Sequence, residues 1–301
     1  MRDFTLAAYR ELLQTCLIDH SCKPVREYDT NDSNQVVYLR HDVDRKPGKA
    51  LQMAKLEHDL DVRSTYFFRC TSECFVPDLI KEIESMGHEI GYHYENLSTA
   101  AQRLGVKRGE LKEISAFFAQ ALKVAMQTSP DSKQPRSRFE ELHLSMDSML
   151  QNTTSKLMDA ALADFQRNLE RLRRLANVTS IAMHGMPFLP IDNRILWLKY
   201  NYQDFGIQRE PYFDIDYNQV LYITDAGRTW FDPIANQRDK VETDFSVTFN
   251  SIGQIQEAIQ SGNLPSKLLF NVHPEHWTDA LAEWHKIAAI RSTKNMIKRL
   301  L

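Results

Sequence analysis

The stretch Val36–Ala50, VVYLRHDVDRKPGKA, decides the fold class of this chain of 301 residues. Its first half is rich in apolar and β-branched residues and predicts a buried strand over 36–42. Its second half predicts a helix over 46–60. Between the two stand a pair of carboxylates, Asp42 and Asp44, separated by one valine. A strand followed directly by a helix is typical of the βαβ units of a parallel sheet.

The alternation of strand and helix continues after this stretch. Strands are predicted over 62–68 and 88–95, where β-branched and aromatic residues are frequent. A helix over 76–87 separates them, with Pro77 in its first turn and Gly87 just past its end. This order predicts a parallel sheet covered by crossover helices. The remaining predicted elements are a helix over 4–17, a largely helical region over 100–177, a strand over 178–185, a helix over 192–200, a hairpin over 212–232, a helix over 251–262, a strand over 267–274 and a C-terminal helix.

The whole chain, 1–301, is predicted to form a single α/β barrel domain. Barrels of this class routinely reach this length as one domain. The helical region is interrupted at 128–138, a stretch of turn-forming composition with two prolines. We interpret the region as a barrel helix extended by a helical insertion at about 120–160.

Composition and charge narrow the classes of function. Apolar residues make up 43% and charged residues 26% of the chain, as in a globular protein with an ample core. A formal net charge of -3, with scattered basic residues, argues against nucleic acid or an anionic membrane as a partner. The sequence shows no secretion signal and no run of about 18 apolar residues, and its four cysteines suit a reducing compartment. We expect a cytoplasmic protein without a membrane span. The sequence does not indicate its oligomeric state.

Four of the predicted strands end in histidine or acidic residues. These endings are HDVD at 41–44, HYE at 93–95, HG at 184–185 and HP at 273–274. Ligands of parallel α/β folds bind beyond the carboxyl ends of the strands, where the loops are free to vary. The residues of the four endings are therefore candidates for a functional site.

The spacing within these endings indicates a cation site. Residues two apart face the same side of a strand, so Asp42 and Asp44 share one face, as do His93 and Glu95. Two buried carboxylates side by side repel each other unless one is protonated or a cation lies between them. Histidine with carboxylate oxygens suits a borderline divalent ion: zinc, manganese, cobalt, nickel or iron(II). Such an ion lowers the pKa of its bound water and polarises a carbonyl, as hydrolysis of an amide or ester requires.

Four stretches carry a further signal: YLRHDVD at 38–44, STYFF at 64–68, MGHEIGYHYE at 86–95 and LLFNVHP at 268–274. Together they resemble the polysaccharide deacetylase superfamily (NodB homology, carbohydrate esterase family 4). The resemblance implies a distorted (β/α) barrel of about seven strands. It also implies one divalent metal ion as cofactor, with zinc expected first. GHEIGYH joined to the upstream aspartates is its most specific part.

Carried over to this chain, the resemblance assigns four residues to the reaction. It implies Asp42 as the general base, Asp44 and His93 as metal ligands, and His273 as the general acid. The two aspartates are separated by Val43, whereas those of the family are adjacent. The roles of Asp42 and Asp44 could therefore be exchanged.

The chain departs from the family at two further positions. The second metal-binding histidine of the family falls on Leu97, which cannot bind a metal. Glu95, on the same strand face as His93, is the expected replacement, with His184 as the alternative. An arginine that orients the base in the family has no counterpart in HGMP at 184–187, so that role is unassigned.

The implied activity is hydrolysis of a non-peptide C–N bond. The resemblance implies removal of an N-acetyl or similar acyl group from a small or lipid-linked amino sugar, in cell-surface polysaccharide biosynthesis. We expect His184 and Trp230 to contact the sugar, and we interpret Asp225 as a turn residue of the predicted hairpin. Two alternatives remain: an inactive carbohydrate-binding barrel, because of Leu97, and a metal-dependent hydrolase of a non-sugar cyclic amide.

Overall fold

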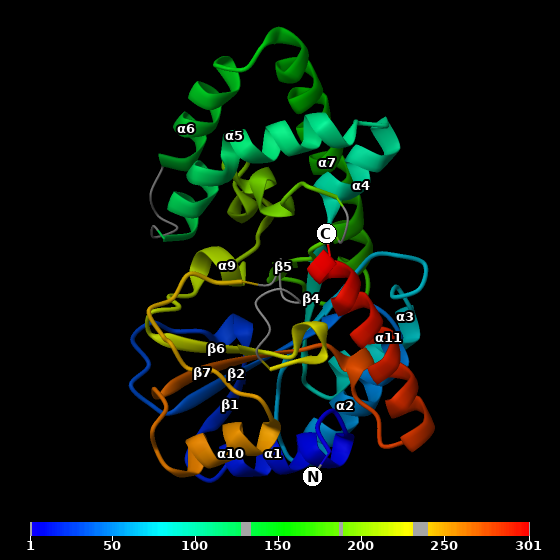
Figure 1. The fold of residues 1–301 in the computed structure, drawn as a ribbon, viewed down its shortest axis with the longest axis vertical. Coiled ribbons are helices and arrows are strands. Elements are labelled where there is room, and N and C mark those ends of the chain that lie inside the picture. Colours follow the sequence, from blue (N-terminus) through cyan, green and yellow to red (C-terminus); the bar gives the residue numbers. More distant parts are fainter. Residues whose placement is uncertain (1, 128–133, 187–188, 231–239, 301) are drawn as a thin grey trace. The chain divides into compact units, whose positions relative to one another are not determined.

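The computed structural model of the chain describes residues 2–127, 134–186, 189–230 and 240–300 (Figure 1). The chain divides into two compact units, which are described separately here. Unit 1 comprises Met1–Ile90 and Ile215–Leu301, and unit 2 comprises Gly91–Asp214. Within the described residues, no helix combines the length and the apolar character that crossing a membrane requires.

Unit 1 contains a parallel sheet centred on β2. Its strands are β1 (Ser21–Pro24), β2 (Val36–Val43), β3 (Thr65–Phe68), β6 (Val220–Thr224) and β7 (Lys267–Val272). β7 pairs with one side of β2, and β6 pairs in turn with β7. On the other side, β1 pairs with the first half of β2 and β3 with the second half. Every residue of β2 is buried, which explains why its sequence begins with an unbroken apolar run.

The helices of unit 1 fix which face of β2 carries polar residues. They are α1 (Leu6–Cys16), α2 (Pro47–Asp59), α3 (Pro77–Ser85), α10 (Ile252–Gln260) and α11 (Leu281–Leu300). α1 and α10 lie side by side and share one core with apolar residues of the sheet, including Val37 and Leu39 of β2 (Figure 1). Because side chains alternate along a strand, Arg40 and Asp42 face the opposite side of the sheet.

Unit 2 combines two parallel strands with a set of helices. β4 (Glu89–Tyr94) begins in the last residues of unit 1 and pairs with β5 (Ile181–Met183). The helices between these strands are α4 (Asn96–Leu104), α5 (Arg108–Gln127), α6 (Gln134–Leu144) and α7 (Ser148–Arg173); α8 (Leu196–Lys199) and α9 (Pro211–Asp214) follow β5. Asp147 caps α7 by accepting hydrogen bonds from the backbone N–H groups of Met149 and Leu150, at 2.9 and 3.0 Å.

The predicted α/β class is confirmed. The described strands form a seven-stranded sheet in the order β5-β4-β3-β2-β7-β6, with β1 beside β2. In unit 1, the N–H of Glu89 donates to the carbonyl of Ser64 at 2.9 Å, which joins the start of β4 to β3. The region predicted to be largely helical, 100–177, contains α4 to α7, between Asn96 and Arg173; residues 128–133 lie outside the described part of the chain, and the insertion at about 120–160 stays a prediction.

One expectation about the strands is wrong, and one strand was not predicted. The region 212–230 does not form a hairpin, because its one strand, β6, runs parallel to β7; residues 231–232 lie outside the described residues. The turn formers before it make a local turn, in which Asp216 accepts a hydrogen bond from the N–H of Asn218 at 3.0 Å. β1 has no sequence signal, because SCKP is short and contains no β-branched residue.

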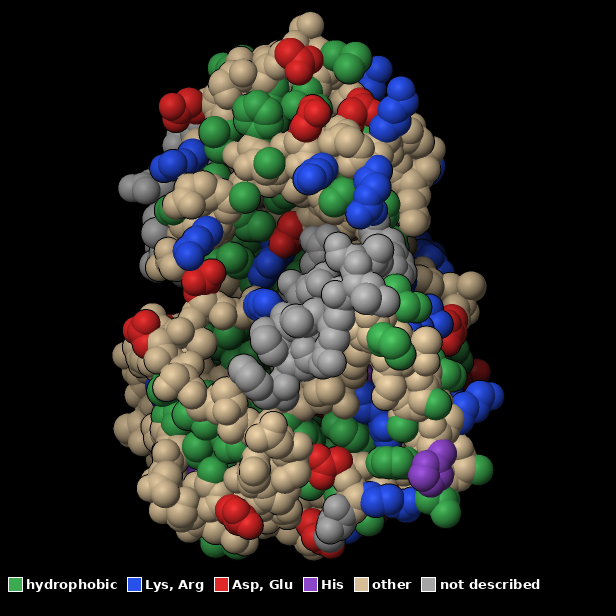
Figure 2. Space-filling model, viewed as in Figure 1, with side chains coloured by type: hydrophobic (Ala, Val, Ile, Leu, Met, Phe, Trp, Pro, Cys, Tyr) green, Lys and Arg blue, Asp and Glu red, His purple; other side chains and the backbone are tan. Residues whose placement is uncertain are grey.

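Charged side chains of both signs are mixed on one face of the molecule. Figure 2 shows Lys and Arg side chains interspersed with Asp and Glu on the face in view. Among the described residues on this face, no large block of one sign gathers. This distribution agrees with the small formal net charge of -3.

Candidate active site

Asp42 is held in a fixed orientation near the end of β2. Arg40 donates to both carboxylate oxygens of Asp42, from Nε and from Nη2, each at 2.8 Å. Asn271 on β7 donates from Nδ2 to Oδ2 of Asp42 at 3.2 Å, and the strand register places Asn271 opposite Arg40. Both charged side chains are buried, so the guanidinium compensates the carboxylate where water cannot.

Arg40 is a candidate for the arginine that orients the base, a role that the sequence analysis left unassigned. The arginine expected after the strand at 178–185 is missing, but Arg40 makes a two-pronged contact with Asp42 from the same strand. The i, i+2 spacing of the two residues was visible in the sequence. Whether such a pair is buried depends on the neighbouring strands, which spacing alone does not reveal.

Asp44 is half-buried just beyond the end of β2. Its backbone carbonyl accepts hydrogen bonds from Nη1 of Arg69 and from Sγ of Cys74, both at 3.1 Å. Lys46 then takes a left-handed backbone conformation, with a φ of 49°, and Pro47 begins α2. These contacts fix the point at which the chain leaves the sheet, and they hold Asp44 at the carboxyl end of β2.

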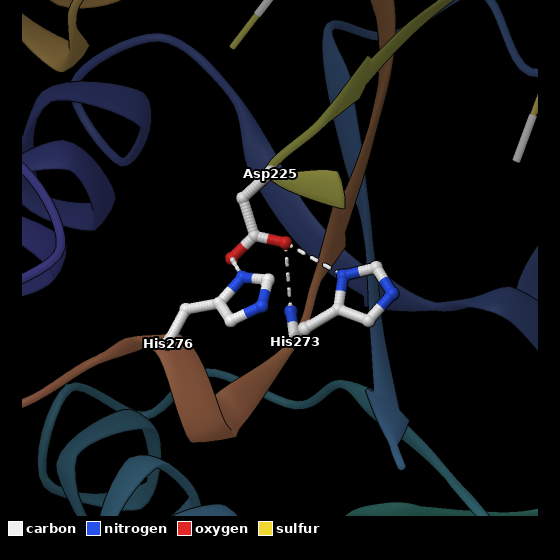
Figure 3. A group of neighbouring side chains, drawn as sticks. All are labelled: Asp225, His273 and His276. Carbon is white, nitrogen blue, oxygen red and sulfur yellow. Dashed lines mark hydrogen bonds and ion pairs between the residues drawn. The ribbon is translucent and has the colours of Figure 1, made fainter. Parts of the chain in front are cut away.

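His273, which follows β7, is held by Asp225, which follows β6 (Figure 3). Nδ1 and the backbone N of His273 lie 2.7 and 2.9 Å from Oδ1 of Asp225. The indole Nε1 of Trp277 donates to the other oxygen, Oδ2, at 2.6 Å. Burial alone would raise the pKa of Asp225, but His276 and His273 offset this effect and lower that pKa below its usual range. Asp225 is therefore a buried carboxylate anion.

His273 is a protonated imidazole at neutral pH. Burial lowers its pKa, but the hydrogen bond to Asp225 and the charge of that carboxylate raise it. The charges of Asp44 and Asp42 raise the pKa of His273 further, to about 10. Because Nδ1 faces Asp225, the proton that His273 can donate is the one on Nε2. Its electrostatic environment thus includes both aspartates at the end of β2.

His276 completes a cluster around Asp225. Its ring stacks on His273 with centroids 5.4 Å apart, and its Nδ1 lies 3.5 Å from Oδ2 of Asp225. Burial is the main cause that lowers the pKa of His276 to about 4, so this imidazole is neutral. One ligand-type atom from each of the three residues lies within 4.8 Å of the others. Asp225 already accepts backbone, imidazole and indole hydrogen bonds, so we interpret the cluster as a device that orients His273, not as a metal site.

In unit 2, three of the predicted site residues lie together. β4 and β5 pair in parallel, which places His93, Glu95 and His184 near the same edge. Nδ1 of His184 lies 2.9 Å from Oε2 of Glu95, and the rings of His93 and His184 have centroids 5.1 Å apart. Nδ1 of His93 lies 2.9 Å from the backbone oxygen of Ala182. All three side chains are buried.

The two imidazoles of unit 2 are oriented as metal ligands are. A carbonyl can only accept a hydrogen bond, so Nδ1 of His93 carries the hydrogen and Nε2 carries the lone pair. The same tautomer is favoured for His184, whose Nδ1 faces the carboxylate of Glu95. Histidine ligands in proteins commonly have a carbonyl or a carboxylate behind the ring, which orients the metal-binding nitrogen. Imidazole nitrogens are donors that a borderline divalent ion accepts, but among the described residues the group whose ligand-type atoms all lie within 4.8 Å of one another is Asp225, His273 and His276.

Two other predicted positions lie in apolar surroundings. Leu97 is fully buried on α4, in unit 2. Trp230 is 7% exposed in the core of unit 1, where it stacks on Phe4 with centroids 5.5 Å apart. Its Nε1 donates to Oδ2 of Asp3 at 2.8 Å. The sugar contact of Trp230 stays a prediction, which this burial does not favour.

Asp225 is the site residue that the sequence analysis missed. The predicted hairpin assigned it to a turn, whereas it follows a parallel strand, in the same position as the other site residues. A usable signal was present, because Asp225 is the first acidic residue after the apolar run Val220–Thr224. The turn-forming composition of Asp225–Gly227 concealed it.

Comparisons with known proteins give only a faint likeness. No protein-family model and no curated protein matches the chain. Among solved structures, the chain is similar to the crystal structure of a CE4 family pseudoenzyme from Bacillus anthracis. The two are 11% identical with a TM-score of 0.36, over 92% of this chain and 67% of the other. A likeness of this size assigns neither family nor activity, so we argue function from the residues of the chain itself.

Proposed function

We propose that this chain is a metal-dependent hydrolase that removes an N-acetyl or similar acyl group from an amino sugar, in cell-surface polysaccharide biosynthesis. One observation carries the proposal. His273, which Asp225 holds in its protonated form, lies in the electrostatic field of Asp42 and Asp44. Amide hydrolysis needs an acid for the leaving amine and a carboxylate that handles the attacking water, and these groups supply both.

The pairing with Arg40 separates the roles of the two aspartates. Arg40 compensates the charge of Asp42 and fixes its orientation, as a base that receives a proton from water requires. Asp44 follows the end of β2, and the motif resemblance implies it as the ligand of the cation. We therefore assign Asp42 as the general base and Asp44 as a metal ligand.

A divalent ion is part of the proposal, with zinc first and manganese, cobalt, nickel or iron as alternatives. The motif resemblance implies Asp44 and His93 as its ligands, with Glu95 or His184 as the third. The hydrogen bond from His184 to Glu95 favours His184 as that ligand, with Glu95 behind it. When bound, the ion would acidify water and polarise the acyl carbonyl.

His273 would donate the Nε2 proton to the amine as the C–N bond breaks. A pKa of about 10 makes the imidazolium stable at neutral pH, so the acid is present in its charged form before the reaction begins. The group that accepts the proton is an amine, which is basic enough to take it at that stage. Asp225 accepts the short hydrogen bond from Nδ1 of His273 throughout, and so keeps the ring oriented while the imidazole loses its charge.

An inactive carbohydrate-binding barrel is the second candidate, and Leu97 favours it. A buried leucine stands where the resemblance places a metal-binding histidine. If no other residue supplies that ligand, the chain binds no metal and catalyses no hydrolysis. The amino-sugar substrate itself is taken from the motif resemblance, so a cyclic amide remains a third candidate substrate.

Metal content and acetate release test the proposal together. The purified protein is expected to hold one divalent ion per chain, which Asp44→Ala and His93→Ala lose and which the exposed control His58→Ala keeps. N-acetylated nucleotide sugars and lipid-linked amino sugars are then screened for released acetate. A protein without metal would support the inactive barrel. A protein that opens a cyclic amide but releases no acetate would show that the substrate class is wrong.

A further inference from the structure

The segment HPEHW at 273–277 encloses one carboxylate. The backbone N–H and Nδ1 of His273 both contact Oδ1 of Asp225. Trp277 and His276 approach the other oxygen, Oδ2. The short helical turn over Pro274–His276 brings these groups to the same carboxylate. Figure 3 shows the two histidines on either side of it.

The two groups at Oδ2 are not equivalent. Nε1 of Trp277 lies 2.6 Å from Oδ2, whereas Nδ1 of His276 lies 3.5 Å away. Neither ring nitrogen of His276 makes a hydrogen bond within the described structure. His276 is therefore a second imidazole beside Asp225, but the indole and not this imidazole hydrogen-bonds to Oδ2.

We propose that Trp277 is a positioning residue: its indole N–H occupies Oδ2 of Asp225, which leaves Oδ1 to fix the tautomer and direction of His273. Trp277 and Asp225 are both fully buried, so no water is at hand to replace the indole donor. If the donor is lost, the carboxylate can satisfy Oδ2 only by turning toward His276, which draws Oδ1 away from His273. The kinetic consequence rests on the proposed function, but the effect on His273 does not.

The effect on His273 is tested by NMR of protein labelled at histidine nitrogen. The wild type should show a protected Nδ1–H signal for His273. In Trp277→Phe, which keeps the ring and removes the donor, exchange of that proton with water should become at least about tenfold faster, as expected for losing a hydrogen bond to a charged group. In Trp277→Phe/His276→Phe the competing imidazole is gone, and part of the protection should return.

Trp230→Phe is the matched control for this signal. Trp230 is also buried, lies 6.0 Å from Trp277 between ring centroids, and donates its indole N–H to a carboxylate, that of Asp3. The two single variants should melt at similar temperatures, while only Trp277→Phe changes the His273 signal. The inference is overturned if both variants leave the signal unchanged, if both alter it equally, or if the wild type shows no protected Nδ1–H.

Kinetics separate this inference from the proposed function. With an active substrate, Trp277→Phe should lower kcat about tenfold with KM unchanged, because only the acid is disturbed. Trp284→Phe, which removes an indole bond to the backbone oxygen of Asp3, should leave both constants unchanged. If Trp277→Phe alters the NMR signal but the wild type hydrolyses no acyl substrate, the proposed function fails and the positioning role stands.

Discussion

At the scale of single residues, charge compensation decides what each carboxylate can do. Asp42 is neutralised by a guanidinium, and Asp225 is neutralised by an imidazolium. Both carboxylates are buried, where an unpaired charge is costly. The site therefore depends on pairs, and removing one partner should damage the other.

Arg40→Ala should destabilise the protein strongly. It leaves the Asp42 carboxylate buried without its guanidinium, and breaking a buried ion pair costs about 3–5 kcal/mol. Arg40→Lys keeps the charge but loses the two-pronged contact, so its loss should be smaller. Unfolding in urea measures both. Lys55→Ala removes an exposed pair with Glu82 and should cost less than about 1 kcal/mol. An equal loss in Arg40→Ala and Lys55→Ala would contradict the buried pair.

The pairing of His273 with Asp225 should make stability depend on pH. The folded-state pKa of His273 is raised from 6.5 to about 10, so its contribution is complete below about pH 6.5 and is lost as pH rises toward 10. The free energy of unfolding of the wild type, minus that of His273→Gln, should therefore shrink over this interval. Urea titrations at several pH values measure the difference, and a constant difference would show that the pair does not form.

At the scale of elements, strand periodicity predicted the strands that carry several of the candidate site residues. β2 and β7 were predicted within one or two residues of their bounds, because buried parallel strands have unbroken apolar runs. Alternation also explains why Arg40 and Asp42 share one face of β2, a pairing that was not predicted. What periodicity could not predict was which strands lie side by side. Asp225 meets His273 only because β6 pairs with β7, and the turn composition before β6 favoured a hairpin instead.

The ends of β4 and β5 give a test of the third metal ligand. Because Glu95 lies behind His184, Glu95→Gln should keep a bound ion but weaken its binding about 10–100-fold, the usual effect of losing such a carboxylate. His184→Ala should lose the ion altogether. Titration of the metal ion into each variant, followed in a calorimeter, measures both affinities. The opposite result, in which Glu95→Gln abolishes binding and His184→Ala only weakens it, would make Glu95 the direct ligand.

At the scale of the whole molecule, the proposed ion should contribute to folding stability. A ligand that binds only the folded state stabilises it by mass action, by about 2.7 kcal/mol when its free concentration is 100 times its Kd. A chelator should therefore lower the melting temperature of the wild type by several degrees. The same chelator should leave Asp44→Ala unchanged, because that variant has already lost the ion.

The variant His276→Phe lets the melting experiment distinguish two possible metal sites. One is the proposed site that includes Asp44, and the other is the group of Asp225, His273 and His276. If the ion is bound by Asp44, the chelator should still lower the melting temperature of His276→Phe, because Asp225 and its neighbours bind no metal. If the ion instead lies among Asp225, His273 and His276, the chelator effect should vanish in His276→Phe and persist in Asp44→Ala. Differential scanning calorimetry of the three proteins, with and without chelator, separates these outcomes, and the second result would contradict the assignment of Asp44 as a ligand.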